Sequence, residues 1–576
     1  MKARSDSTFH GWRFHLLAVL LGSLALLLVW RLVSLQLLDT ERGYRFLQDQ
    51  GDARALRDEI IPVHRGIISD RNGEPLAVST PVQTLSADPR ELKASDTDFA
   101  RLGALLGTRP EVLKARVQES ASRRFIYLRR HMNPVDAAAV MDLGIKGISS
   151  AREYQRFYPA GPVAAHLVGL TNVDDIGQEG VEATYNPWLA GTPGRKRVIK
   201  DRFSHVIRDV QELAPARPGH ALDLSIDLRI QYLAYRELKK GVEAAKAESG
   251  SIVLLDARTG EILAMTNYPS YNPNNRSTAV GDVLRNRVVT DITEPGSTVK
   301  PFTILTGLES GKYTPDTLID TAPGYIRVGR KTIRDHHSLG VIPVSSVITK
   351  SSQVGTIKIA LSVDPESIHQ NFRNAGFGQL VGEGLKGEVA GRFPSPRRWD
   401  DLTRATFAFG YGLSVTPLQL ARAYLMLANG GKSRPVKLLK VMELPPAIQV
   451  FPEEHVTQLV AMMETVTRDG GTAKKGAIPG YRVAGKTGTV HRSAGKDGYK
   501  ADNYQSLFAG FVPASAPRIV GVVVITDPRG GVYYGGAVAA PVFSAVARGA
   551  LRLLNVPPDD VPPMQVAGGT AAVPST

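Results

Sequence analysis

The most strongly apolar stretch of the chain lies near its N-terminus. The residues from Leu16 to Trp30 are uncharged and rich in leucine, and Leu32 and Val33 continue the stretch past Arg31. A helix needs about 20 apolar residues to cross a bilayer, and residues at its ends extend such a core by reaching toward the interface. The pattern predicts one membrane-spanning helix over residues 14–37. No later apolar segment is long enough to span.

Basic residues precede this helix at Lys2, Arg4 and Arg13. Because basic flanks favour the cytoplasmic side, we expect a cytoplasmic tail over residues 1–13 and the remainder of the chain across the membrane. A cleaved signal peptide is the alternative. It needs a small-x-small cleavage site after the apolar stretch, and residues 30–36, Trp-Arg-Leu-Val-Ser-Leu-Gln, offer none.

Residues 38–220 alternate short apolar and polar segments of mixed charge. Residues 65–69 predict a strand, Asn72-Gly73 predicts a tight turn, and residues 76–78 predict the second strand of a hairpin. Helical periodicity follows over residues 98–106 and 110–117, and a later helix carries Tyr185 and Leu189. This region pairs no nucleophile with a base at a recognisable spacing, so we interpret it as a structural scaffold.

Residues 221–555 carry longer elements that indicate an α+β domain. Alternation predicts a strand over 221–226, and helical spacing predicts a helix from 228 to about 246. Residues 251–256 and 261–265 flank a hairpin turn. Further strands are expected over 506–512 and 519–526, with a helix over 540–553. Strands at both ends suggest one antiparallel sheet whose terminal strands meet, flanked by helices. Residues 556–576, rich in Pro, Gly, Ala and Thr, predict a disordered tail.

Length and charge narrow the class of protein. At 576 residues the chain needs more than one core. It has no cysteine, which excludes zinc thiolate sites, iron–sulfur clusters and disulfides, and we expect neither a metal nor a cofactor. The net charge is +15, but no basic stripe is interleaved with aromatics, which argues against nucleic acid. An anionic membrane or cell-wall polymer is the favoured partner.

The first chemical signal is Ser297-Thr-Val-Lys300, which follows Glu-Pro-Gly and opens an apolar run. In the first turn of a helix this spacing places a hydroxyl and an amine on one face. A serine becomes a good nucleophile when a neighbouring base takes its proton, and a lysine shielded from water is such a base. The same spacing recurs at Ser493 and Lys496, but in a loop rich in glycine and charge, so we attribute that copy to chance.

Two further segments complete an acyl-transfer site. Lys486-Thr487-Gly488-Thr489 ends a predicted strand, where Lys486 and the Thr487 hydroxyl would bind a substrate carboxylate and Gly488 would let a substrate backbone approach. In Lys350-Ser351-Ser352-Gln353, Ser351 would relay a proton and the Gln353 amide would bind a substrate peptide group.

These motifs resemble the penicillin-binding protein and β-lactamase superfamily, whose three signatures are S-x-x-K, S-x-N and K-T-G. The resemblance is closer to the class B penicillin-binding proteins, and within them to the division-specific members of Gram-negative bacteria. It rests on residues 294–302, 409–412, 484–489 and 506–511, while residues 65–73 and 177–182 resemble the N-terminal pedestal of that class.

The resemblance implies a serine transpeptidase domain of the penicillin-binding and β-lactamase-like fold over residues 221–555, after an elongated α/β pedestal over residues 38–220. Ser297 would attack the penultimate D-alanine of a peptidoglycan stem peptide and Lys300 would take its proton. The N–H groups of Ser297 and Thr489 would form an oxyanion hole. β-Lactams would acylate Ser297. The resemblance also implies the inner membrane as location, with the catalytic domain in the periplasm, and a polytopic glycosyltransferase and other divisome proteins as partners.

One position departs from the family pattern. Gln353 stands where the family has asparagine, which displaces the amide by about a bond length, and a misplacement of about 1 Å costs on the order of a hundredfold in rate. The alternatives are therefore a weakly catalytic scaffold or β-lactam-binding paralogue, and an elongation-specific transpeptidase. A single-domain β-lactamase does not account for the pedestal, and residues before 220 show no paired carboxylates for glycosyl transfer.

Overall fold

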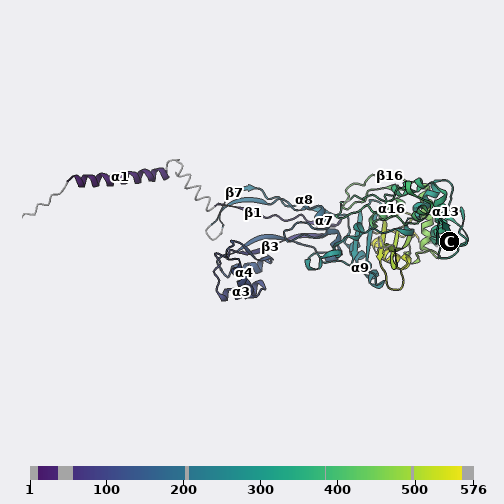
Figure 1. The fold of residues 1–576 in the computed structure, drawn as a ribbon, viewed down its shortest axis with the longest axis horizontal. Coiled ribbons are helices and arrows are strands. Elements are labelled where there is room, and N and C mark those ends of the chain that lie inside the picture. The colour runs from purple at the N-terminus through teal and green to yellow at the C-terminus, as the bar shows by residue number, and fades with distance from the viewer. Residues whose placement is uncertain (1–10, 37–55, 201–205, 383, 494–498, 561–576) are drawn as a thin grey trace, which may run out of the picture. The chain divides into compact units, whose positions relative to one another are not determined.

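The structure is a computed structural model that describes residues 11–36, 56–200, 206–382, 384–493 and 499–560 (Figure 1). Within these ranges one helix, α1 (Gly11–Gln36), is long and apolar enough to cross a membrane. It confirms a helix at the position expected for the anchor. Most of the predicted cytoplasmic tail and of the predicted disordered tail lies outside the described residues.

The chain forms two compact units whose boundaries differ from a single cut at residue 220. Of the described residues, those within 1–64, 81–154 and 191–218 form one unit, and those within 65–80, 155–190 and 219–576 form the other. Two parts of the predicted pedestal thus belong with the C-terminal residues. The physical reason is burial, because Ile68, Leu76, Tyr158 and Val181 join the same hydrophobic core as the C-terminal sheet. The pedestal boundaries stay a prediction.

Within the described ranges, the part of the smaller unit that follows α1 contains strands and the helices α3, α4 and α5. Helices α3 (Asp96–Leu106) and α4 (Pro110–Glu119) confirm the predicted helical periodicity, and Ser95 caps α3 with a capping box. Their apolar faces share a core with α5 (Pro134–Met141) and with β4 (Ile126–Met132), which pairs antiparallel with the end of β3 (Pro75–Ala87). A three-stranded antiparallel sheet contains β1 (Leu56–Ile61), β6 (Gly194–Lys200) and β7 (Val206–Ala214).

The first segments of the larger unit confirm the predicted hairpin and correct one helix. Strand β2 (Ile68–Ser69) turns back into β3, and Ile68 pairs with Ala77. The strand expected over 221–226 shortens to β8 (Leu222–Asp223), which pairs parallel with β2. The single helix expected to carry Tyr185 and Leu189 is two helices, α7 (Gly180–Thr184) and α8 (Asn186–Leu189). Pro187 has no N–H to donate to Ala183, so the helix cannot continue through Tyr185.

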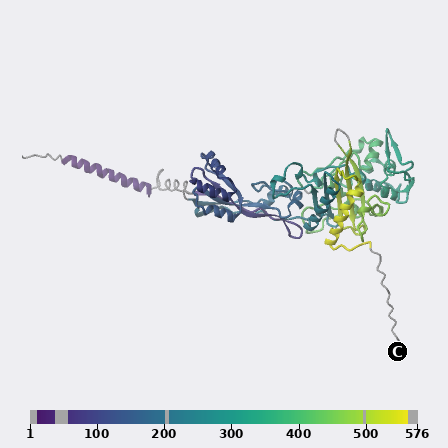
Figure 2. The same cartoon turned by 90° about the horizontal axis from the view of Figure 1, so that it is seen from below.

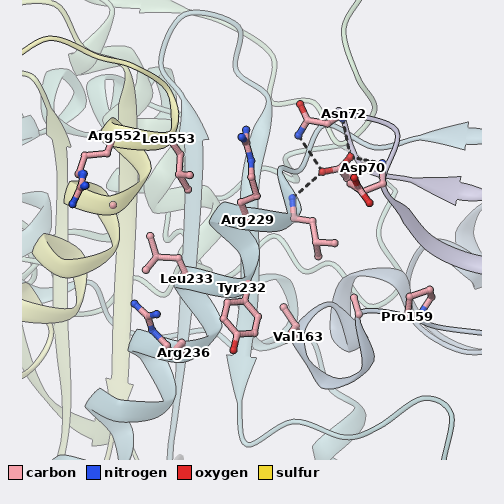
Figure 3. Close-up of a pocket in the computed structure, with 14 residues that line it drawn as sticks. Asp70, Asn72, Pro159, Val163, Arg229, Tyr232, Leu233, Arg236, Arg552 and Leu553 are labelled. Atoms are coloured by element: carbon pink, nitrogen blue, oxygen red, sulfur yellow. Dashed lines mark hydrogen bonds between the residues drawn. The ribbon is translucent and has the colours of Figure 1, made fainter.

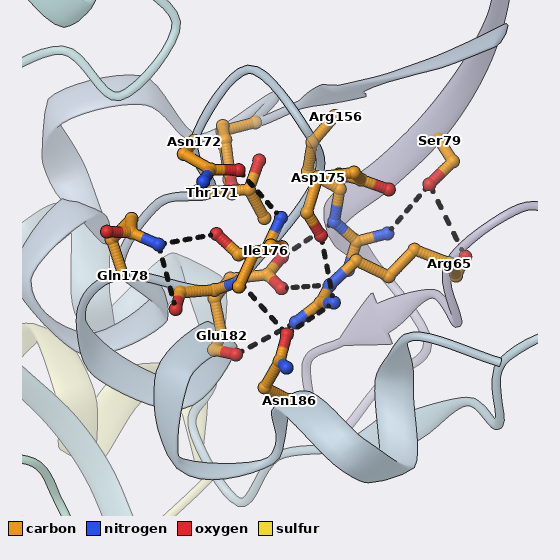
Figure 4. A network of polar contacts seen from close by, with 12 residues as sticks. Arg65, Ser79, Arg156, Thr171, Asn172, Asp175, Ile176, Gln178, Glu182 and Asn186 are labelled. Atoms are coloured by element: carbon orange, nitrogen blue, oxygen red, sulfur yellow. Dashed lines mark hydrogen bonds and ion pairs between the residues drawn. The ribbon is translucent and has the colours of Figure 1, made fainter.

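A buried ion network joins the two stretches that carried the pedestal resemblance (Figure 4). The Glu182 carboxylate accepts hydrogen bonds from Arg65 Nε at 2.5 Å and from Arg156 Nε at 2.6 Å. The side chains of all three residues are at most 1% exposed. Arg65 also donates to the Glu182 carbonyl at 2.8 Å and to Asn186 Oδ1 at 2.8 Å. Around this network, burial raises the pKa of Asp175 to about 6.

The larger unit is organised around the predicted antiparallel sheet, whose strand order is β10-β9-β19-β18-β17. The hairpin of β9 (Ser249–Asp256) and β10 (Ile262–Tyr268) forms one side of this sheet. The other side is formed by β17 (Ala484–Ser493), β18 (Tyr499–Val512) and β19 (Ile519–Thr526). Pairing of β19 with β9 confirms that the terminal strands meet.

The interior strands β9 and β19 are buried along nearly their whole length, because helices cover both faces of the sheet. Helices α9 (Leu228–Ala244) and α19 (Ala540–Leu553) pack together against the sheet, and their chain segments lie side by side in Figures 1 and 2. Helix α16 (Pro417–Ala428), almost entirely buried, also packs against β9, β18 and β19.

The remaining elements used below also belong to the larger unit, and η4, α17 and α18 pack against β17. They are the 3₁₀ turn η4 (Gly296–Val299), the strands β12 (Tyr325–Val328) and β13 (Lys331–Arg334), and the helices α11 (Lys300–Glu309), α12 (Val344–Lys350), α13 (Gln353–Ser362), α14 (Pro365–Asn374), α17 (Glu453–Glu464) and α18 (Gly535–Val538).

The buried network predicts a large stability effect at Glu182. The change Glu182→Ala leaves two buried guanidinium groups without their counter-charge, which costs about 3–5 kcal/mol in the free energy of unfolding. Glu179→Ala, which breaks a half-exposed pair with Lys386, is the matched control and should cost less than about 1 kcal/mol. Chemical denaturation of both variants measures the difference, and equal losses would contradict this role for Glu182.

Candidate active site

Ser297 lies on the turn that leads into a buried helix, close to the predicted position. The turn is the 3₁₀ segment η4, and α11 begins at Lys300, so Ser297 precedes the α-helix by one turn. Pro301 follows at the helix start, where a missing N–H costs nothing. Apolar side chains bury α11 along most of its length. They fix the backbone below the serine, whose side chain stays half-buried.

Ser351 lies at a reversal between two helices. It ends α12 with a left-handed backbone, φ 57°, and the next residue, Ser352, begins α13 as its N-cap by accepting a hydrogen bond from Gly355 N at 2.9 Å. A non-glycine residue in the left-handed region is uncommon and is kept where the surroundings hold it. Here the strain places the Ser351 hydroxyl between two lysines.

The two predicted lysines meet at this hydroxyl. Lys486 Nζ donates to Ser351 Oγ at 2.9 Å, and Lys300 Nζ donates to the same oxygen at 3.2 Å and to the Ser351 carbonyl at 2.5 Å. Both lysines are 0% exposed. Residues separated by almost two hundred positions in the chain therefore form one hydrogen-bonded cluster around Ser351.

Burial changes the acid–base chemistry of this cluster. Loss of hydration lowers the pKa of Lys300 to about 7, and the Asp335 carboxylate partly opposes that shift. Burial, followed by repulsion from Lys300, also holds the pKa of Lys486 well below its usual range. Two ammonium groups that share one oxygen without water repel each other strongly. At neutral pH the cluster thus holds an uncharged amine that is able to act as a base.

The strand that carries Lys486 lies at the edge of the sheet, against the turn that carries Ser297. β17 pairs only with β18 in this five-stranded sheet, and η4 packs on it. The close contact depends on glycine. A Cβ at Gly488 would lie 3.0 Å from the Pro295 carbonyl oxygen, and one at Gly296 would lie 2.3 Å from Val490 Cγ1. Gly488 therefore admits the Ser297 turn, whereas the sequence suggested that it admits substrate.

The other predicted residues of this strand are held by hydrogen bonds. Thr487 Oγ1 lies 3.1 Å from Thr472 Oγ1, and Thr489 Oγ1 accepts from Gly535 N at 3.0 Å, at the start of α18. An edge strand also leaves alternate backbone groups without a partner in its sheet, which is the arrangement that an extended peptide pairs with.

Gln353 lies beside this cluster, at the start of α13. Its side chain is half-buried and lines a cavity of about 560 Å³ together with Arg334, Tyr411 and His491. The structure thus places Gln353 in the lining of a cavity, two residues after Ser351 in the chain. This is the position at which the sequence departs from the family asparagine.

Asp335 is a residue that the sequence did not single out. It follows β13 and accepts hydrogen bonds from Ser352 Oγ at 2.5 Å, from Val354 N at 3.2 Å and from Gln353 N. These bonds fix the segment that carries Ser351 and Gln353. Asp335 also opposes the downward pKa shift of Lys300. A lone aspartate outside every motif gives no signal in the sequence, because its role depends on contacts across 16 intervening positions and more.

The second S-x-x-K copy is described only in part. Ser493 ends β17, and residues 494–498, which include Lys496, lie outside the described residues. The attribution of this copy to chance stays a prediction.

Comparison with known proteins gives the family. The profile for the penicillin-binding protein transpeptidase domain matches residues 250–548, and the profile for the penicillin-binding protein dimerisation domain matches residues 60–224. The chain is 44% identical over 564 residues to the peptidoglycan D,D-transpeptidase FtsI of Escherichia coli K12, covering 97% of this chain and 94% of that protein. It is 40% identical to the probable peptidoglycan D,D-transpeptidase PbpC of Pseudomonas aeruginosa, with 96% and 98% covered.

A solved structure is similar over most of the chain. The crystal structure of penicillin-binding protein 3 from Mycobacterium tuberculosis, complexed with aztreonam, is 28% identical and has a TM-score of 0.67, with 88% of this chain and 99% of that chain covered. Profiles, sequence relatives and fold agree with the three motifs found here, and the chain belongs to the class B penicillin-binding proteins.

Proposed function

We propose that this protein is a peptidoglycan D,D-transpeptidase that cross-links stem peptides through an acyl-enzyme on Ser297, in septal wall synthesis. The observation that carries the proposal is the buried cluster in which Lys300 and Lys486 both donate to Ser351, next to the turn that bears Ser297. The similarity to FtsI of Escherichia coli and to penicillin-binding protein 3 supports the septal role.

In the acylation step, Ser297 Oγ attacks the carbonyl carbon of the penultimate D-alanine of a stem peptide. Its proton passes to the uncharged amine of Lys300, for which a pKa of about 7 is well matched to neutral pH. The C–N bond to the terminal D-alanine breaks, and its nitrogen takes a proton through the Ser351 hydroxyl. The product is an ester on Ser297 and free D-alanine.

The second step reverses these proton transfers. An amine of a neighbouring stem peptide attacks the ester carbonyl and loses a proton to the Ser351 and Lys300 pair. The Ser297 oxygen leaves and is protonated again, and a new amide bond joins the two strands. The N–H groups of Ser297 and Thr489 stabilise the oxyanion in both steps, each contributing about 3 kcal/mol.

Lys486 and the edge strand hold the substrate. A terminal carboxylate next to Lys486 favours the charged ammonium, so binding would reverse the pKa depression caused by burial. The Thr487 hydroxyl adds a hydrogen bond, and the free edge of β17 pairs with the extended peptide. The Gln353 amide binds a peptide group of the same substrate, and β-lactams acylate Ser297 because they imitate it.

We further propose that α1 anchors the protein in the inner membrane with its N-terminus in the cytoplasm and its catalytic domain in the periplasm. The basic residues before the helix support this orientation. A polytopic glycosyltransferase, which would supply uncross-linked strands, and other divisome proteins are the expected partners.

The proposal predicts where penicillin binds. Fluorescent penicillin should label the wild-type chain and should not label Ser297→Ala, because the acyl-enzyme forms on that oxygen. Ser493→Ala, which removes the serine of the second S-x-x-K copy, is the matched control and should label fully. Gel fluorescence gives the measurement, and label that persists in Ser297→Ala would overturn the assignment.

The pKa of Lys300 predicts the pH dependence of acylation. The base acts in its uncharged form, so the second-order rate constant for penicillin should rise with pH through about 7. At pH 5 about 1% of a group with that pKa is uncharged, and the rate should be roughly a hundredfold below its maximum. Stopped-flow measurement of the acylation rate at each pH tests this dependence. Circular dichroism shows over which pH range the protein stays folded. A rate that is flat from pH 5 to 8 would contradict Lys300 as the base.

Asp335 is predicted to position the Ser351 segment. Asp335→Asn weakens three hydrogen bonds and removes the charge that raises the pKa of Lys300, so acylation should slow about tenfold and its pH midpoint should move down. Asp364→Asn, at an aspartate that caps α14, is the control and should change neither quantity. A slower rate with an unmoved midpoint would leave Asp335 a structural residue only.

A further inference from the structure

A second concave site lies within the larger unit, between α9 and α19 (Figure 3). We call it the α9–α19 cavity. Its volume is about 1150 Å³, and it is lined by residues of both helices, of the turn after β2 and of residues 159–163. None of the residues assigned to the reaction above lines it. Ligand cavities usually measure about 300–1,000 Å³, so this one has room for more than a single small metabolite.

Apolar side chains form the floor of this cavity. Leu233 of α9, Leu553 of α19 and Val163 line it and are half-buried. Tyr232 also lines it and is 55% exposed, which is a large accessible surface for an aromatic ring in a concavity. Such a floor binds methyl groups and the apolar faces of sugar rings through burial of apolar surface.

Three arginines surround this floor and keep donors available. Arg229 binds Asp227 through Nε and Nη2, and Arg236 binds Glu237 through the same two nitrogens, so Nη1 of each stays available. Within the described ranges, Arg552 has no side-chain hydrogen bond or ion pair. Guanidinium groups bind carboxylates with directed, charge-assisted hydrogen bonds.

Two acidic residues line the cavity: Glu74 is exposed on the turn after β2, and Asp70 is already satisfied by hydrogen bonds. Asp70 is 1% exposed and accepts hydrogen bonds from the backbone N–H groups of Asn72, Glu74 and Leu228. Its carboxylate ties the turn after β2 to the start of α9 and so builds the wall of the cavity. A ligand that enters between the arginines therefore meets donors for carboxylates on one side and apolar surface beneath.

We propose that the α9–α19 cavity is a second binding site for the peptidoglycan strand, which holds an uncross-linked stem peptide by its carboxylates outside the reaction centre. This rests on the proposed function, since it takes peptidoglycan as the substrate. A stem peptide combines free carboxylates with alanine methyl groups beside sugar rings, which matches the donors and the floor. A protein partner usually needs about 800 Å² of broad surface, which a cavity does not provide.

A second site has a clear use for an enzyme that acts on a polymer. One strand carries many identical stem peptides, so binding of one at the α9–α19 cavity raises the effective concentration of the others. Weak binding at each site is then enough for the enzyme to stay on its strand.

The test blocks the reaction centre and measures what remains. The full chain in detergent is acylated with penicillin and titrated calorimetrically with a soluble disaccharide-pentapeptide. Acylated wild type should bind the fragment, and Arg552→Glu should bind it at least tenfold more weakly. Arg548→Glu, an equal charge change one turn earlier on α19 and outside the lining, should bind as wild type does. Tyr232→Ala is a second, charge-neutral variant and should also weaken binding.

Several results would overturn this proposal. Acylated wild type that does not bind, or Arg548→Glu and Arg552→Glu that weaken binding equally, would exclude a specific site. A photo-crosslinker placed at Tyr232 in cells should capture muramic-acid-containing glycan, and capture of a protein instead would overturn the assigned ligand. Penicillin labelling separates the two proposals: normal labelling without fragment binding removes only the second site, whereas absent labelling removes the proposed function itself.

Discussion

The chemistry proposed for this protein depends on two lysines that share one serine hydroxyl away from water. Lys300 and Lys486 are fully buried, and each donates a hydrogen bond to Ser351. Water would stabilise both as ammonium ions, whereas burial lowers the pKa of each. In the proposed mechanism Lys300 acts in its uncharged form, and a bound substrate carboxylate restores the charge of Lys486. The Asp335 carboxylate adjusts the balance without binding either lysine directly.

The fold supports this pairing through rigid backbone and close contacts. Strands buried on both faces fix β17 at the edge of the sheet, and buried α11 fixes Lys300 below it. The backbone at Gly410 lies so close to the turn that bears Ser297 that a Cβ at Gly410 would lie 2.2 Å from the Gly296 carbonyl oxygen. Glycine at 296 and 488 therefore lets the turn that bears Ser297 lie against β17, and glycine at 410 lets a third segment lie against that turn. The role of Gly488 toward substrate stays a prediction.

Much of this arrangement could be predicted from local patterns. The helix over 540–553 and the adjacent strands over 506–512 and 519–526 follow from periodicity alone, and the structure reproduces them. The break at Tyr185 also has a local signal in the sequence, because Pro187 lacks the N–H that a continuous helix needs. The contacts of Asp335, the sharing of Ser351 by two lysines and the Arg65–Glu182–Arg156 network could not be predicted in this way. They depend on which side chains meet over long separations, and periodicity carries no information on that.

In the two proposals, Gln353 and the cavity between α9 and α19 act on substrate choice and affinity rather than on the reaction itself. Both lie on the same framework: Gln353 begins a helix held by Asp335, and the cavity is walled by helices that pack on the sheet. In the proposed mechanism, the protonation state of Lys300 decides whether Ser297 is activated.

The protonation state of Lys300 is directly measurable by NMR of the full chain with ¹⁵Nζ-labelled lysine. The account predicts a lysine signal that titrates near pH 7, well below the usual value of about 10.4, and that is absent from Lys300→Met. If every lysine signal of the wild-type chain titrates above pH 9, Lys300 is charged at neutral pH and the account of its role as base is contradicted.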